Sequence, residues 1–196
     1  MTLKYNLQFF DYWHLSSGLS SGAKLDSIVV KDNDNIPYAP AKTIKGLLRE
    51  MFVELFGCEE TYKIFGFQSN EQDKCYDKDL ENKSSLLHFK NATIPQDTKD
   101  EIVSNTLQGN LYDIIASTKI GEKNNTKETY GIAVTDSLRE IEVVIPLTLE
   151  GEILDIPTKD DFDKLKKALK MIKRMGLNRN RGLGRCEFKD IMMEEL

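Results

Sequence analysis

The sequence predicts a mixed α+β fold, and three patterns along the chain support this prediction. Residues 3–9 alternate apolar and polar side chains, which is typical of a strand with one buried face. Residues 44–56 carry apolar side chains at the i, i+3, i+4 spacing of an amphipathic helix, and a second such helix follows Thr158. Further strand-like runs lie at 86–89, 141–149 and 185–191. The predicted order is strand, helix, strand, strand, helix, strand, which is a ferredoxin-like (RRM-like) βαββαβ core with insertions.

Local signals set the predicted ends of both helices. Pro40 keeps the preceding residue out of the helical region and opens the first helix, and Gly57 ends it. Thr158 is expected to cap the second helix, with Asp161 three residues later completing a capping box. Acidic residues at the start of this helix and lysines toward its end match the helix dipole.

We expect residues 1–196 to form one domain with two surface insertions. The first insertion, at about 58–85, is highly charged and poor in aliphatic residues except for a short helical turn at 64–67. The second, at 109–136, reads as an extended loop or hairpin that projects from the core. A Gly/Ser-rich loop follows the first strand, and a Gly-rich loop precedes the last one.

Composition limits the class of protein. The chain has 27 basic and 32 acidic residues, 40% apolar residues, and no apolar run near the roughly 20 residues of a membrane span. Its N-terminus has no signal-peptide pattern, so we expect a cytoplasmic protein without a membrane partner. Cys58, Cys75 and Cys186 are widely spaced and form no C-x-x-C pair, which predicts neither a zinc knuckle nor a disulfide framework.

Positive charge gathers near the end of this otherwise acidic chain. Ten Lys or Arg residues lie between Lys164 and Lys189, against one acid, Glu187. Gly176, Gly182 and Gly184 lie in the same segment and allow close approach of the backbone to a partner. A basic segment with accessible amides suits a phosphate-bearing ligand. The alternative for this segment alone is a helix cap followed by a solvated turn.

Several motifs in order resemble one known family. The segments 23–32, 36–40 and 43–49 read AKLDSIVVKD, IPYAP and TIKGLLR. They resemble the RAMP superfamily of CRISPR-associated proteins, and more narrowly the repeated backbone subunit of type III (Csm/Cmr) effector complexes. Further matches follow in the same order at residues 64–66, 89–92, 119–136 and 176–188.

The resemblance implies that the chain holds guide RNA through phosphate contacts without reading base edges. On the first helix, Lys42, Lys45 and Arg49 share one face, with a solvated polar face as the alternative. The C-terminal loop adds a second set of predicted contacts: Arg179, Arg181, Gly182, Gly184 and Arg185. Before the helix, Ala41 and Lys42 replace the Gly-Ser pair of the family, so a lysine side chain replaces part of a backbone contact there.

The resemblance also makes Asp26 the candidate catalytic residue. It occupies the position of the aspartate that the family requires for target RNA cleavage, where it would help to hold a divalent cation, expected to be Mg²⁺, or orient the attacking 2′-hydroxyl. Without the resemblance, a loop aspartate is ordinarily a turn residue. His14 is a less favoured catalytic candidate, because related nucleases that process guide precursors use a histidine; its alternative is a strand-end histidine with a local hydrogen bond. Spacing alone reveals no metal-ligand cluster.

Three functions remain open at this point. The first is a guide-binding backbone subunit that also cleaves target RNA in antiviral defence through Asp26. The second is a non-catalytic RAMP adaptor or structural subunit, and the third is a stand-alone endoribonuclease that processes guide precursors with His14. The expected partners are guide RNA, target RNA, other CRISPR effector subunits and copies of the chain itself.

Overall fold

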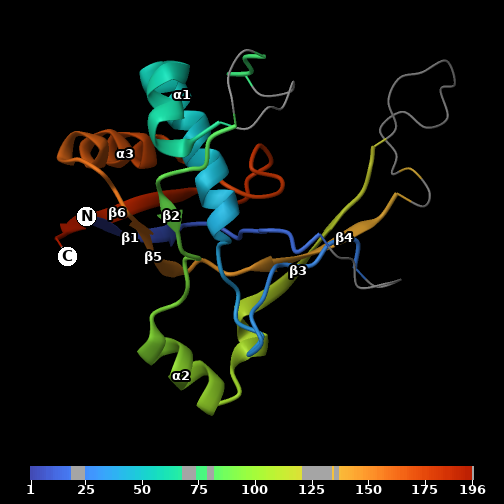
Figure 1. The fold of residues 1–196 in the computed structure, drawn as a ribbon. Coiled ribbons are helices and arrows are strands. Elements are labelled where there is room, and N and C mark those ends of the chain that lie inside the picture. Colours follow the sequence, from blue (N-terminus) through green and yellow to red (C-terminus); the bar gives the residue numbers. More distant parts are fainter. Residues whose placement is uncertain (19–24, 68–73, 79–81, 121–133, 135–136, 196) are drawn as a thin grey trace, which may run out of the picture.

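The computed structural model describes residues 1–18, 25–67, 74–78, 82–120, 134 and 137–195 (Figure 1). The elements are β1 (Thr2–Phe9), α1 (Ala41–Phe65), β2 (His88–Phe89), α2 (Gln96–Ser104), the 3₁₀ turn η1 (Gln108–Leu111), β3 (Tyr112–Ser117), β4 (Arg139–Val144), β5 (Thr148–Leu154), α3 (Lys159–Met171) and β6 (Cys186–Glu194). The predicted mixed α+β class is confirmed. In the described part of the chain, no helix is long and apolar enough to cross a membrane.

The main sheet has four strands in the order β2-β5-β1-β6, and every neighbouring pair is antiparallel. The predicted first strand is confirmed as β1, which lies in the middle of the sheet with Leu3 and Leu7 fully buried. Helices α1 and α3 pack together over one face of this sheet (Figure 1). Leu48 of α1 and Leu165 of α3 are fully buried in the shared core.

One predicted strand is in fact two strands in different sheets. Residues 141–149 were expected to form a continuous strand, but β4 ends at Val144 and β5 begins at Thr148. Pro146 lies between them and has no N–H to donate to a sheet. β4 pairs with β3 in a separate two-stranded sheet that extends away from the main sheet (Figure 1). The tip of the predicted projection, residues 121–133 and 135–136, lies outside the described residues.

Helix α1 breaks where the sequence places its end. Gly57 has a φ of 80° and a ψ of 174°, and the helix resumes after it to Phe65. The chain then returns through the first insertion, of which 68–73 and 79–81 lie outside the described residues. The prediction of no disulfide is wrong, because Cys58 and Cys75 are bonded. The break at Gly57 and the returning insertion bring their Cα atoms to 5.5 Å, within the range that a disulfide spans.

Helix α2 was not predicted. None of its residues is buried, so its sequence lacks the apolar stripe that marks an amphipathic helix. The helix contacts the rest of the protein through the partly buried Ile102, which packs against the core, and through Lys99, whose ammonium lies 2.7 Å from the carboxylates of both Asp32 and Asp34.

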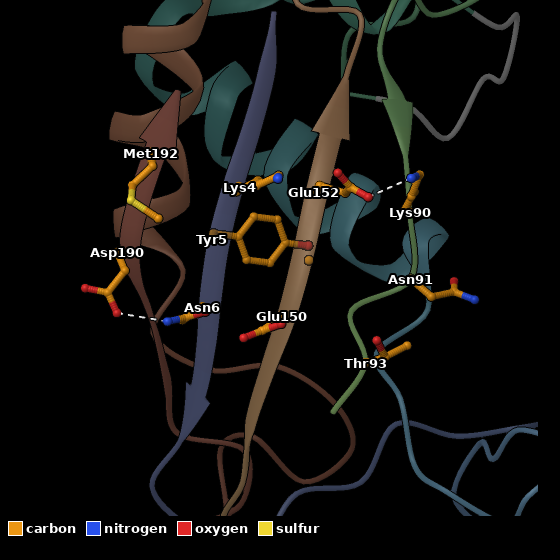
Figure 2. Close-up of a pocket in the computed structure, with 11 residues that line it drawn as sticks. Lys4, Tyr5, Asn6, Lys90, Asn91, Thr93, Glu150, Glu152, Asp190 and Met192 are labelled. Carbon is orange, nitrogen blue, oxygen red and sulfur yellow. Dashed lines mark hydrogen bonds and ion pairs between the residues drawn. The ribbon is translucent and has the colours of Figure 1, made fainter. Parts of the chain in front are cut away.

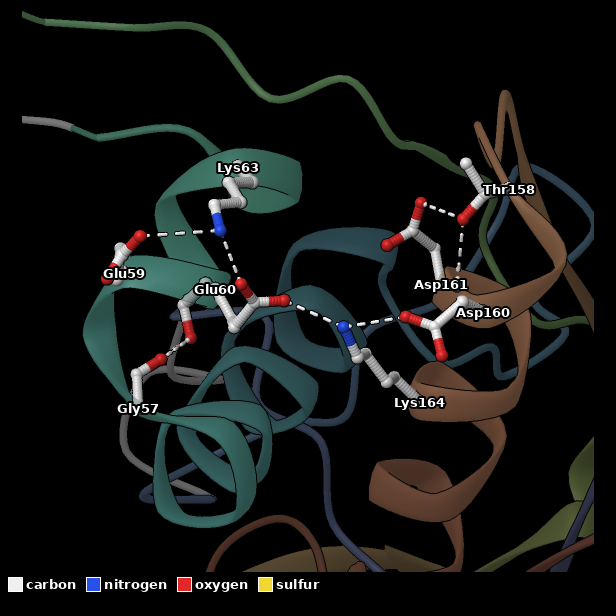
Figure 3. A network of polar contacts seen from close by, with 9 residues as sticks. Gly57, Glu59, Glu60, Lys63, Thr158, Asp160, Asp161 and Lys164 are labelled. Carbon is white, nitrogen blue, oxygen red and sulfur yellow. Dashed lines mark hydrogen bonds and ion pairs between the residues drawn. The ribbon is translucent and has the colours of Figure 1, made fainter.

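A polar network joins α1 to α3 (Figure 3). The Lys164 ammonium lies 2.7 Å from the Glu60 carboxylate and 2.8 Å from that of Asp160. The hydrogen bond from Lys164 to Glu60, and another from Lys63, lower the pKa of Glu60 to about 2. At the start of α3 the predicted capping is confirmed, because the Thr158 hydroxyl accepts a hydrogen bond from the Asp161 amide.

Candidate RNA-binding interface

Asp26 is fixed against β4 although its side chain is exposed. Its amide donates to the Glu140 carbonyl at 2.9 Å, and its Oδ2 accepts from the Glu140 amide at 2.8 Å. The next residue, Ser27, forms a parallel bridge with Ile141. Among the described residues, Oδ1 of Asp26 makes no hydrogen bond. One carboxylate oxygen therefore anchors the residue, and the other is available to a ligand.

His14 lies beside this segment and is fully buried. Its Nδ1 lies 2.6 Å from the Glu142 carbonyl and its Nε2 lies 2.9 Å from Ser27 Oγ. Because a carbonyl only accepts, neutral His14 carries its proton on Nδ1 and accepts from Ser27 through Nε2. With both ring nitrogens bonded inside the core, His14 holds the Asp26 segment in place and does not reach a ligand, which corrects its candidacy as a catalytic residue.

The Gly-rich loop, residues 176–184, packs on the same strand that holds Asp26. Leu183 is buried against Ile141 and Val143 of β4. Two of the loop glycines serve contacts within the chain: a Cβ on Gly176 would lie 2.3 Å from the His14 carbonyl oxygen, and one on Gly184 would lie 2.0 Å from that of Met175. The Gly184 amide donates to the Tyr12 carbonyl. Of the predicted glycine contacts, only Gly182 has open space around it.

The three predicted arginines of this loop differ in their surroundings. Arg179 and Arg181 are exposed and make no side-chain ion pair within the described residues. Arg185 is also exposed, but its Nε lies 3.3 Å from Asp11 Oδ2 and its guanidinium lies 5.3 Å from the centre of the Phe10 ring. Arg179 and Arg181 are therefore ready for an anionic ligand, whereas Arg185 already has partners.

The three predicted cations of α1 do not act as one set. Lys45 and Arg49 line a hollow of about 220 Å³, which the buried Phe65 and Phe67 also border; Lys42 is exposed and lies outside it. Partial burial, and then the charge of Arg49, lower the pKa of Lys45, so an anion at this place would be stabilised. Lys83 joins this hollow from the first insertion. Sequence reasoning missed Lys83, because its position beside α1 depends on the backbone pairing of Phe67 with Lys83.

A larger hollow of about 470 Å³ lies on the face of the main sheet that the helices leave open (Figure 2). Its lysines are paired with acids: Lys4 with Glu194 and Lys90 with Glu152. The buried Tyr5 hydroxyl beside it has no hydrogen-bond partner among the described residues, and burial raises its pKa. With its cations neutralised, this face does not suit the phosphate backbone of a nucleic acid.

The residues near Asp26 do not form a metal site of their own. In the described ranges, no group of three or more His, Cys, Asp or Glu side chains is placed to hold a metal ion. Mg²⁺ is typically bound through one or two carboxylates together with substrate phosphates and water. Among the described residues, the acids around Asp26 do not form such a group and therefore do not fit a resident cation.

Comparisons with known proteins identify the family. The model of the RAMP superfamily matches residues 7–187, and the chain belongs to this superfamily. Among solved structures, a chain of the type III-B Cmr-beta complex bound to cognate target RNA matches with a TM-score of 0.71 and 16% sequence identity. The match covers 97% of this chain and 59% of the Cmr-beta chain. A chain of the apo Cmr-beta complex has a TM-score of 0.66 at 12% identity, covering 98% and 99%. A search of the curated proteins found no match.

Proposed function

We propose that this chain is a guide-RNA-binding subunit of a type III CRISPR effector complex and that it cleaves target RNA through Asp26. Membership of the RAMP superfamily and the fold shared with Cmr-beta chains support the class of complex. This chain spans 59% of the length of the Cmr-beta chain from the target-bound complex. The fold therefore supports the class of complex and not the role of that whole chain. The strand order β2-β5-β1-β6 with α1 and α3 on one face supports the assignment of a ferredoxin-like core.

One observation carries the proposal: the Gly-rich loop and Asp26 are attached to the same strand. Leu183 seats the loop on Ile141 and Val143, and Asp26 pairs with the neighbouring Glu140. Exposed Arg179 and Arg181 thus lie on a loop fixed to the strand that presents a carboxylate oxygen. This arrangement suits a phosphate-gripping loop beside a group that acts on the bound strand.

In the proposed reaction, Oδ1 of Asp26 accepts a hydrogen bond from a 2′-hydroxyl of the target RNA, orients it toward the adjacent phosphorus and takes its proton as the O2′–P bond forms. The P–O5′ bond breaks, the leaving 5′-oxygen takes a proton from solvent, and the products are a 2′,3′-cyclic phosphate and a 5′-hydroxyl. Asp26 then returns its proton to solvent. A divalent cation, if the assembled complex uses one, would need ligands from the RNA or from other subunits in addition to Asp26.

The second candidate function is a RAMP subunit that binds guide RNA without cutting. Among the described residues, no group of three or more possible metal ligands lies near Asp26, and this favours the second candidate unless the assembled complex supplies a further catalytic group. The third candidate, processing of guide precursors by His14, loses its support, because that histidine is buried and bonded at both nitrogens.

The RNA-binding part of the proposal is tested by the double variant Arg179→Gln/Arg181→Gln. Binding of labelled single-stranded RNA is measured by anisotropy over a range of salt concentrations. We expect weaker binding. The slope of the logarithm of the binding constant against the logarithm of the salt concentration should become shallower by about 0.7 for each phosphate contact that is lost. The matched control is Lys167→Gln/Lys170→Gln, which removes the same charge from the exposed side of α3. Equal affinity of the arginine variant and the wild type at low salt would remove the loop from the interface.

A further inference from the structure

A hollow of about 460 Å³ lies at the base of the Gly-rich loop, outside the residues assigned above except for Arg185. It is lined by Phe10, Lys173, Arg174, Arg185, Cys186 and Glu187. These residues come from the end of β1, the segment after α3 and the start of β6. We call this hollow the Phe10 pocket.

The Phe10 pocket carries an excess of positive charge. Four cations surround it, because Lys189 lies 5.2 Å from the Phe10 ring centre in addition to the three basic lining residues. Only two acids pair with them: Asp11 with Arg185 at 3.3 Å, and Glu187 with Lys173 at 3.9 Å and Lys189 at 3.6 Å. These pairs are long and exposed, so they hold the cations weakly and leave them open to a stronger anion.

The positive field extends to the floor of the pocket. Burial raises the pKa of the Cys186 thiol to about 12, while the charges of Lys173 and Arg174 act against this rise. The backbone around the pocket is also well connected. The Cys186 amide donates to the Lys173 carbonyl, the Phe10 amide donates to the Arg185 carbonyl, and Arg174 Nη1 donates to the Arg179 carbonyl. The pocket is thus preformed and continuous with the Gly-rich loop.

An aromatic ring and a guanidinium share one wall of this pocket. Phe10 is half-buried, the Arg185 guanidinium lies 5.3 Å from its ring centre, and Arg185 Nε lies 3.3 Å from Asp11 Oδ2. A flat guanidinium supported by a ring is a surface on which a base stacks, and the neighbouring cations Lys173 and Arg174 match a phosphate.

We propose that the Phe10 pocket binds one nucleotide of single-stranded RNA, with its phosphate against Lys173 and Arg174 and its base on the Arg185 guanidinium that Phe10 supports. This inference rests on the proposed RNA-binding function and adds residues that the sequence motifs did not indicate. It extends the RNA path from the Gly-rich loop to the ends of β1 and β6.

The experiment tests the proposed phosphate contacts and the proposed base contact separately. Binding of oligouridylate and of an abasic oligonucleotide of equal length is measured for the full chain and its variants. Lys173→Gln/Arg174→Gln should weaken binding of both ligands, by about tenfold at low salt, with a salt slope reduced by about 0.7 to 1.4. Phe10→Leu should weaken oligouridylate binding by about fivefold or more and leave abasic binding unchanged. Phe10→Tyr keeps the ring and should bind like the wild type.

The controls distinguish the possible failures. Lys167→Gln/Lys170→Gln removes equal charge elsewhere on the basic segment and should bind RNA like the wild type, and circular dichroism verifies that each variant folds. If the Arg179/Arg181 variant loses affinity but the pocket variants do not, the pocket assignment is overturned while the proposed function stands. If the wild type binds no RNA, both are overturned. If polyglutamate binds as tightly as RNA and loses affinity in the same variants, the pocket is a site for acidic protein and the nucleotide assignment is wrong.

Discussion

Gly182 and Gly184 flank the same leucine but face different surroundings. Both have a positive φ, 91° and 70°, which is a backbone conformation that residues with a side chain rarely adopt. A Cβ on Gly182 would meet open space, whereas one on Gly184 would lie 2.0 Å from the Met175 carbonyl oxygen. Sequence alone assigns both glycines to ligand approach. The structure gives Gly184 a different task, which is to let the loop turn back against its own chain.

We therefore predict that Gly184→Ala destabilises the fold by about 3 kcal/mol or more, through backbone strain together with the clash. Gly182→Ala is the matched control, and it should lower the free energy of unfolding by about 1–2 kcal/mol through backbone strain alone. Urea unfolding of both variants measures the difference. Equal loss of stability in the two variants would show that the close approach at Gly184 contributes nothing.

Asp26 and His14 show what sequence can and cannot assign at the level of single residues. The motif identifies Asp26 as a candidate, but its anchoring to Glu140 depends on a strand more than 100 residues away. His14 was a candidate because related nucleases use a histidine and because it ends the first strand beside the Gly/Ser-rich loop. Its burial and its bonds to Glu142 and Ser27 become visible only when the fold brings β4 beside residues 13–16.

At the level of elements, the predictions succeeded where local signals agree with packing. The alternation of β1 and the Thr158 cap are local signals, and both predictions were correct. Gly57 was predicted to end the first helix, but the helix only breaks there and resumes to Phe65, inside the segment assigned to the first insertion. The split between β4 and β5 was missed, because the apolar run Val143–Ile145 was read through Pro146, and the two strands pair in different sheets. Helix α2 was missed since it has no fully buried residue, and its ion pairs with Asp32 and Asp34 join it to a loop that is distant in the sequence.

The contact between α1 and α3 leads to a prediction on pH. Because hydrogen bonds from Lys164 and Lys63 lower the pKa of Glu60 in the folded state to about 2, against an ordinary value of 4.5, its contribution to stability is present above pH 4.5. That contribution is lost as pH falls from 4.5 toward 2. The Glu60 side chain is still about one-third accessible to solvent, at 32%, so the effect should be small and screened by salt.

We expect the Glu60→Gln variant to lose stability relative to the wild type at neutral pH and to match it near pH 2. Thermal unfolding at several pH values checks this. Glu50→Gln, an exposed acid in the first half of α1, is the control. A stability difference between Glu60→Gln and the wild type that does not change between pH 7 and pH 2 would contradict the assignment.

At the level of the whole molecule, an acidic chain gathers exposed positive charge on a few surfaces. The Gly-rich loop carries the exposed Arg179 and Arg181, and the Phe10 pocket carries four cations against two acids among the described residues. The hollow beside α1 is lined by Lys45, Arg49 and Lys83, while the lysines of the open sheet face are paired with acids. Sequence reasoning located the first and part of the third from the charge pattern. It could not find the Phe10 pocket, because its residues come from opposite ends of the chain and meet only when β1 pairs with β6.

The most direct test of the central claim is cleavage of labelled target RNA by a complex assembled on guide RNA, with and without a chelator. Asp26→Asn keeps the acceptor for the Glu140 amide but removes the negative charge, and Glu140→Gln is the matched control, since Asp26 uses only the backbone of Glu140. We predict one cut per subunit for the wild type and the control, and a rate at least about 100-fold lower for Asp26→Asn with unchanged guide binding. Cutting by Asp26→Asn at the wild-type rate would contradict the account.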